Sequence, residues 1–223
     1  GIEEGDFTLV FGFPGRTNQY LPSFAVEQTV DIIDPARIGV RDISLGIMDK
    51  HMRADEDIRL AYSAKYAGIS NSWKKWIGEV LGLKSKNAVG VKEAQEGDFT
   101  ELVRKNKDLK DAYGHLLPDM KLLYQELDPI IKNRTLLAEV IGGSNVEIFL
   151  LAAYADRLVK AFRENGDSGY STMESKTLAA LDNFYREYRV GVDKELFSAL
   201  TAHLEKNLSE EYKAEVLASK PAS

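Results

Sequence analysis

Large apolar residues near the start of the chain alternate with Thr8, Val10 and Gly12. Phe7, Leu9, Phe11 and Phe13 recur at every second position, which is the period of a β-strand with one buried face. A turn is expected directly afterwards, at Pro14–Gly15. No second strand of comparable strength follows, and a single strand leaves its backbone donors and acceptors unpaired. Either this strand packs onto a helical domain, or its partner strands lie outside the sequence. We favour the second interpretation and expect the chain to be a piece of a larger protein.

From Asp34 onward the apolar spacing becomes helical. Asp34 is a suitable N-cap, and Pro35 suits the first position of a helix. Apolar residues then recur every three to five positions as far as Met52. We therefore expect a long helix that runs towards Gly68, with a break near Lys50.

The rest of the chain also predicts helices. A second helical piece should end around Gly82, and later helices are expected over residues 87–104, 119–141, 145–164, 174–190, 193–206 and 209–219. Gly142–Gly143 and Asn165–Gly166 are stop signals, and Ser209 is a start signal. Because the connections are short, the helices should pack as antiparallel neighbours. The predicted fold class is mainly α, a bundle-like helical domain with a short N-terminal β segment.

Composition and charge narrow the possible functions. The 223 residues include 29 Lys and Arg against 35 Asp and Glu, so the net charge is 29 − 35 = −6. This acidic balance argues against nucleic acid as a main partner, since phosphate binding needs a surplus of basic residues. No apolar run approaches the roughly 18 residues of a membrane span, so we expect no membrane insertion. The chain has no cysteine, which excludes disulfides, thiolate catalysis and Cys-ligated zinc.

One short string matches a catalytic motif. Residues 166–169 read Gly-Asp-Ser-Gly, as around the nucleophile of chymotrypsin-like proteases. That chemistry needs the serine on a tight turn with a histidine within hydrogen-bond reach. Here the string lies between two predicted helices, with no flanking strand and no Gly-Pro after it. We interpret it as a helix–helix loop, in which Gly166 ends the first helix.

The histidines and acids do not form a recognisable catalytic or metal site. His51, His115 and His203 are far apart in the sequence, and no H-E-x-x-H motif is present. We expect each histidine to be structural or solvent-facing. The residues therefore predict no catalytic group, no metal and no cofactor.

Residues 62–78 stand out from the rest. They hold both tryptophans of the chain, Trp73 and Trp76, together with Asn71. An asparagine amide near a helix junction could accept a hydrogen bond from a ligand's ammonium group and donate one to a carbonyl. The alternative is that the tryptophans are core anchors and that Asn71 is the N-cap of a following helix.

The same segment carries a family resemblance. Three stretches of the chain carry it: G-D-F-T-L-V-F-G-F-P-G-R-T-N-Q-Y-L (residues 5–21), P-A-R-I (35–38) and Y-S-A-K-Y-A-G-I-S-N-S-W-K-K (62–75). Together they resemble the bacterial dipeptidyl-peptidase 7 and 11 family. These are serine exopeptidases with a chymotrypsin-like double β-barrel and a large inserted helical domain. The resemblance implies that residues 1–33 are the end of a β-barrel portion and a linker, and that residues 34–223 are the helical, or cap, domain.

The resemblance also implies roles for particular residues. In the family the catalytic histidine and aspartate precede this segment, and the serine follows it in a G-x-S-G-S-P context, so no catalytic role carries over to this chain. The helical domain covers the cleft and supplies an asparagine that holds the free α-amino group of the peptide, and Asn71 matches it by motif. Trp73 is then expected to support Asn71 by packing. The implied partners are a peptide substrate and the β-barrel domain, and the implied location is the periplasm or cell surface of a Gram-negative bacterium.

Two other functions compete with this interpretation. A freestanding helical module could bind a partner helix in a groove, without enzymatic activity. A self-contained hydrolase could use Ser168 as its nucleophile. The helical module explains the helices, but it explains neither the N-terminal β segment nor the matched motifs.

Overall fold

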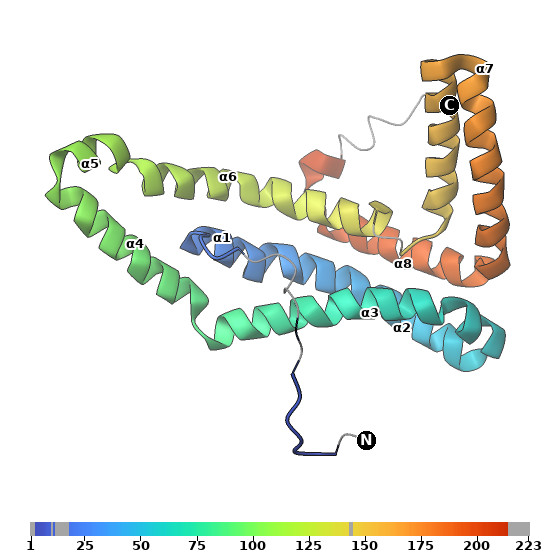
Figure 1. Cartoon of the computed structure of the whole chain (residues 1–223), viewed down its shortest axis with the longest axis horizontal. Helices are drawn as coiled ribbons and strands as arrows, with labels where there is room; N and C mark the ends of the chain where they lie inside the picture. Colours follow the sequence, from blue (N-terminus) through green and yellow to red (C-terminus); the bar gives the residue numbers. More distant parts are fainter. Residues whose placement is uncertain (1–2, 10, 12–17, 143–144, 214–223) are drawn as a thin grey trace.

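The computed structural model describes residues 3–9, 11, 18–142 and 145–213 of the chain. Its helices in chain order are α1 (Ser23–Gln28), the π-helical turn η1 (Thr29–Ile33), α2 (Asp34–Ala54), α3 (Glu56–Ser85), α4 (Ala88–Lys105), α5 (Lys107–Tyr113), α6 (Leu116–Leu137), the π-helical turn η2 (Ala138–Gly142), α7 (Ile148–Glu187) and α8 (Val190–Asn207). The described ranges contain no strand, so the mainly α fold class is confirmed. Figure 1 shows α3 and α6 on opposite sides of α1 and α2, with α4 and α5 crossing between them at one end.

The alternating N-terminal segment does not form the predicted strand where it is described. Phe7, Leu9 and Phe11 are all exposed, and residues 3–9 lack regular structure apart from a short turn. Phe13 and the turn at Pro14–Gly15 lie outside the described residues. An extended segment without a neighbouring strand has no partner for its backbone groups, which explains why the period of two alone does not produce a strand here.

The helical part begins earlier than the sequence predicts. The prediction that Asp34 is an N-cap is wrong, because α1, η1 and α2 form one continuous helical run from Ser23. Pro35 lies inside this run, where its ring would clash with the carbonyl group four residues before it in a regular α-helix. The π-helical turn η1 ends at Ile33, two residues before Pro35, and widens the backbone in the turn that the proline ring faces. The domain division at residue 33 stays a prediction.

The break between α2 and α3 lies at Asp55, five residues after the predicted position. Asp55 has extended backbone angles, and its side chain accepts hydrogen bonds from the backbone N–H groups of Asp57 (2.8 Å) and Ile58 (3.1 Å). This N-cap satisfies two of the amide donors that a helix start leaves free. From there α3 continues without interruption to Ser85, so the predicted helix junction near Gly68 is wrong.

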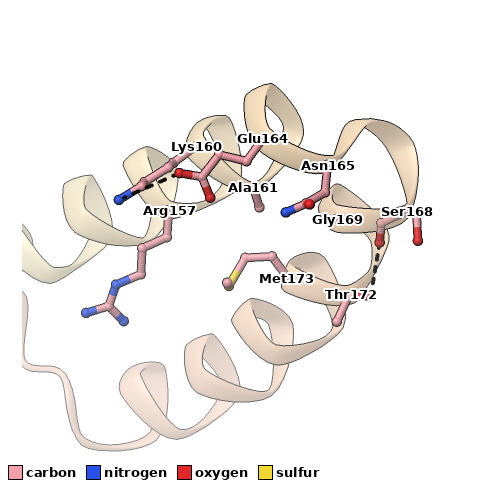
Figure 2. Close-up of a pocket in the computed structure, with 9 residues that line it drawn as sticks. All are labelled: Arg157, Lys160, Ala161, Glu164, Asn165, Ser168, Gly169, Thr172 and Met173. Atoms are coloured by element: carbon pink, nitrogen blue, oxygen red, sulfur yellow. Dashed lines mark hydrogen bonds and ion pairs between the residues drawn. The ribbon is translucent and has the colours of Figure 1, made fainter.

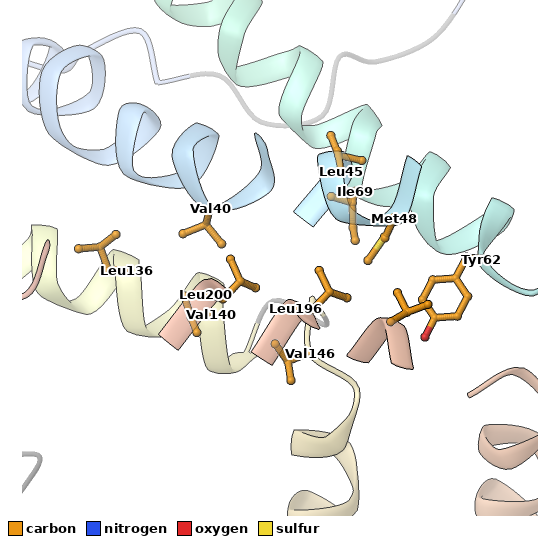
Figure 3. Packing of buried hydrophobic residues seen from close by; sticks show 11 residues of the cluster. Val40, Leu45, Met48, Tyr62, Ile69, Leu136, Val140, Val146, Leu196 and Leu200 are labelled. Atoms are coloured by element: carbon orange, nitrogen blue, oxygen red, sulfur yellow. The ribbon is translucent and has the colours of Figure 1, made fainter. Parts of the chain in front are cut away.

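The hydrophobic core forms around α2. Val40, Leu45 and Met48 of α2 pack against Tyr62 and Ile69 of α3 on one side. Figure 3 shows the other side of the cluster, to which α6, η2, the segment before α7, and α8 contribute Leu136, Val140, Val146, Leu196 and Leu200. One face of α3 is thus buried in this cluster. The opposite face of α3 is consequently turned to the surface.

Two antiparallel arms make up α7, which rises from one end of the bundle (Figure 1). The arms meet at Gly166, whose φ of 59° and ψ of −150° are not helical. Asp193 of α8 holds the base of the hairpin, because its carboxylate accepts hydrogen bonds from the backbone N–H groups of Glu147 (2.5 Å) and Ile148 (3.0 Å). None of the helices in the described part of the chain is both long and apolar enough to cross a membrane.

Candidate functional site

Asn71 lies in the middle of α3 on an exposed face of the helix. The alternative role as an N-cap is therefore wrong, since the helix neither begins nor breaks there. The neighbours of Asn71 on this face, three to seven residues away, include Ala67, Gly68 and Gly78, all of which are exposed. A Cβ atom added at either glycine would meet nothing within 4 Å. Lys74 and Lys75, three and four residues after Asn71, are also exposed on this face, and Lys75 pairs with Glu79 at 3.1 Å. The helix thus presents the Asn71 amide between two lysines and open glycine positions, where an extended peptide can approach the backbone closely.

Trp73 points in nearly the opposite direction, because two residues along an α-helix correspond to a rotation of about 200°. Its indole Nε1–H donates a hydrogen bond of 2.7 Å to Asp42 Oδ1 of α2, and its ring packs at the edge of the core cluster. Trp76 is buried in the same interface. The interpretation of both tryptophans as anchors is confirmed. Trp73 therefore packs on the α3 face that lies opposite Asn71, and its role in supporting Asn71 stays a prediction.

Two arginines of α2 surround Trp76. The guanidinium carbon of Arg37 lies 4.9 Å from the centre of the indole ring, and that of Arg41 lies 4.5 Å from it, so both make cation–π contacts. Glu139 of η2 pairs with both guanidinium groups, with a distance of 3.0 Å to Arg41 Nε and 3.9 Å to Arg37 Nε. Sequence analysis did not identify this cluster. A usable signal exists, since two arginines one helical turn apart repel each other unless acids or aromatic rings lie between them.

Asp34 lies beside this cluster and is almost completely buried. Its Oδ1 is 3.4 Å from Arg37 Nη1, whereas its Oδ2 has no hydrogen-bond partner among the described residues. Burial, reinforced by the nearby charge of Glu79, raises the pKa of the Asp34 carboxyl to about 6.

A second polar cluster joins α3 to the base of α7. The Tyr62 hydroxyl donates a hydrogen bond of 2.5 Å to Glu147 Oε2, and Lys65 Nζ lies 3.4 Å from Glu147 Oε1. The Tyr188 hydroxyl donates to Asp193 Oδ2 at 3.1 Å. Burial lowers the pKa of Lys65, and burial together with Asp193 raises the pKa of Tyr188 to about 12. These contacts tie α3 and the start of α8 to the base of α7.

The Gly-Asp-Ser-Gly string forms the turn between the arms of α7. Ser168 lines a hollow of about 550 Å³ between the arms. Figure 2 shows Lys160 and Glu164 on one arm and Thr172 and Met173 on the other. The Thr172 hydroxyl donates to the Ser168 carbonyl oxygen at 3.0 Å, as in an ordinary helical turn. No histidine lines the hollow. The prediction that Gly166 ends the first helix is confirmed, but the predicted loop is wrong, because Asp167, Ser168 and Gly169 already belong to the second helical arm.

The histidines lie apart from one another in the structure. His51 Nε2 is 2.8 Å from Glu195 Oε2, His203 is partly buried against Gly39, and His115 precedes α6. Within the described ranges, no group of three acidic or histidine side chains gathers as metal ligands would.

Comparisons with known proteins identify the family of the chain. The sequence model of the family described as Peptidase S46 matches residues 1–220. The chain belongs to the peptidase S46 family. Among curated S46 relatives, an Asp/Glu-specific dipeptidyl-peptidase of Capnocytophaga gingivalis is 39% identical over 213 residues, which are 93% of this chain and 30% of the relative. A dipeptidyl-peptidase 7 of Porphyromonas endodontalis is 34% identical over 90% of this chain and 23% of the relative.

A solved structure shows the same fold. The crystal structure of Porphyromonas endodontalis DPP11 in complex with the dipeptide Arg-Glu matches with a TM-score of 0.68 and 20% sequence identity. The match covers 90% of this chain and 28% of that one. This S46 chain thus spans less than a third of the length of the relatives it matches. The resemblance to the dipeptidyl-peptidase 7 and 11 family is confirmed.

Proposed function

We propose that the chain is the helical cap domain of a bacterial serine dipeptidyl-peptidase, which removes dipeptides from free peptide N-termini. It would cover the substrate cleft of a β-barrel catalytic domain in the same protein. Relatives named as dipeptidyl-peptidases align along about 90% of the chain, and this similarity carries the proposal. The helical fold that the chain shares with part of DPP11 also supports it.

Within this cap, we propose that Asn71 helps to bind the α-ammonium group of the peptide. An exopeptidase that removes two residues must measure its substrate from a charged N-terminus. Where the cleft closes over that end, an ammonium group without acceptors is costly to desolvate. The exposed amide of Asn71 can supply one acceptor, and the open space at Gly68 and Gly78 leaves room for the peptide backbone.

The test is Asn71→Ala in the full-length peptidase that carries this chain. Loss of one charge-assisted hydrogen bond of about 1.5–3 kcal/mol should lower kcat/KM roughly 10- to 150-fold for a dipeptidyl substrate with a free amino group. A substrate that lacks the amino group should show almost no further loss. The matched control is Asn183→Ala, which removes an exposed helical asparagine of α7 and should leave both rates unchanged. Equal rates for Asn71→Ala and the parent enzyme would remove Asn71 from the site.

We further propose that the catalytic triad lies outside this chain and that the intact peptidase works in the periplasm or at the cell surface. The absence of a histidine around Ser168 supports the first part. The second part rests on family resemblance, and fractionation of cells that express the full-length protein would test it.

A further inference from the structure

Arg41 connects three elements of the bundle. Its Nε donates a hydrogen bond of 3.0 Å to Glu139 Oε2 of η2, and its Nη1 donates one of 3.3 Å to the carbonyl oxygen of Ile69 in α3. Its guanidinium plane also contacts the ring of Trp76, at 4.5 Å. One side chain of α2 therefore holds both α3 and η2.

The Arg41 contacts are largely shielded from water. Arg41 and Glu139 are each only 12% exposed, and Trp76 is 9% exposed. A rigid planar guanidinium can donate in two directions while it stacks on a ring, whereas a lysine ammonium on its flexible stem cannot. The arrangement thus depends on arginine in particular and not only on a positive charge.

The contact with α3 is close to Asn71. Ile69 lies two residues before Asn71, and its carbonyl is the atom of α3 that Arg41 holds. A helix with its side chains has a radius of about 5–6 Å, so a rotation of about 10° moves a surface amide by about 1 Å. A shift of that size at a substrate-binding group can reduce a rate by up to about a hundredfold.

We infer that Arg41 is a positioning residue for Asn71: it fixes the rotation of α3 and so the place at which the Asn71 amide meets the peptide N-terminus. This inference rests on the proposed function of Asn71. Arg41 itself contacts no substrate, because its guanidinium is held between α2, α3 and η2 on the side of α3 that faces away from Asn71.

A double-mutant cycle in the full-length peptidase tests the inference. Arg41→Lys should lower kcat/KM about tenfold for a free-amine dipeptidyl substrate, and it should cause less than about a twofold further loss when combined with Asn71→Ala. The matched control is Arg53→Lys, because Arg53 is on the same helix but is mostly exposed and pairs with Asp49. The control should leave the rate unchanged.

The outcomes separate this inference from the proposed function. If Arg41→Lys reduces the rate equally with and without Asn71→Ala, Arg41 does not act through Asn71 and the inference is wrong. It is also wrong if Asn71→Ala reduces the rate and Arg41→Lys does not. If Asn71→Ala itself has no effect, the proposed role of Asn71 fails and the inference fails with it.

A second variant guards against a folding defect. Glu139→Gln keeps the shape of the side chain but removes the charge that holds Arg41 Nε. It should also lower kcat/KM, by a smaller factor than Arg41→Lys does, and only when Asn71 is present. If the Glu139→Gln protein melts at the parent temperature and retains the parent rate, the positioning role of the cluster is contradicted.

Discussion

Asp34 shows how a single side chain can make the stability of the bundle depend on pH. Its carboxyl is buried within a continuous helix, with one oxygen near Arg37 and the other without a hydrogen-bond partner in the described part. In the unfolded chain its pKa should be near the ordinary value of 3.8, against about 6 in the folded protein. Between these two values the folded state binds more protons than the unfolded state, so stability falls as the pH rises.

Asp34→Asn should therefore stabilise the chain at neutral pH. The expected gain in the free energy of unfolding is at most about 3 kcal/mol above pH 6. It should shrink as the pH falls below 6 and approach zero only below about pH 3, where the parent carboxyl is protonated in both states. Urea unfolding of the two proteins at pH 4, 5, 6 and 7.5 measures it. A difference that does not change with pH would contradict the assigned titration.

Gly166 controls the shape of α7 at the scale of the element. Its φ of 59° combined with a ψ of −150° lies in a region that only glycine occupies without strain. Both arms of α7 are helical around it, so this one residue turns a helix of 40 residues into a hairpin. The sequence signal Asn165–Gly166 predicts this turn correctly because a local backbone preference decides it.

Gly166→Ala should destabilise the chain by about 1–3 kcal/mol, since the added Cβ is strained at this φ and ψ. Gly97→Ala is the matched comparison. Gly97 lies inside α4 with open space around it, and alanine there should stabilise by about 0.5–1 kcal/mol. Thermal unfolding of both variants followed by circular dichroism tests the contrast. Equal melting temperatures for the two variants would contradict it.

Other elements could not be predicted from local signals. Pro35 and Gly68 resemble helix boundaries in the sequence, yet both lie inside helices. A π-helical turn accommodates Pro35, and the buried face of α3 outweighs the roughly 1 kcal/mol cost of a glycine in a helix. Arg41 is a similar case, because its partners Ile69 and Glu139 are 28 and 98 residues away in the sequence. Its role depends on tertiary packing that no short motif records.

At the scale of the whole molecule, the chain corresponds to less than a third of each dipeptidyl-peptidase compared with it. The family resemblance could be detected from short motifs around residues 5–21 and 62–75 because they combine turn residues, tryptophan and asparagine in a specific order. The surroundings of Asn71 could not be predicted, since they depend on the rotation of α3 against α2.

The purified 223-residue chain should release no dipeptide from a free-amine substrate, because the proposed triad lies elsewhere. Ser168→Ala should leave this baseline unchanged. The full-length peptidase serves as the positive control under the same conditions. Activity of the purified chain that disappears in the Ser168→Ala variant would instead support a self-contained hydrolase.

The most direct measurement is a crystal structure of the full-length peptidase with a dipeptide in its cleft. The account predicts that the Asn71 side-chain oxygen lies about 2.7–3.2 Å from the N-terminal nitrogen of the dipeptide, with Arg41 still bound to the carbonyl of Ile69. A dipeptide whose ammonium group is held entirely by other residues, with the Asn71 amide beyond contact distance, would contradict it.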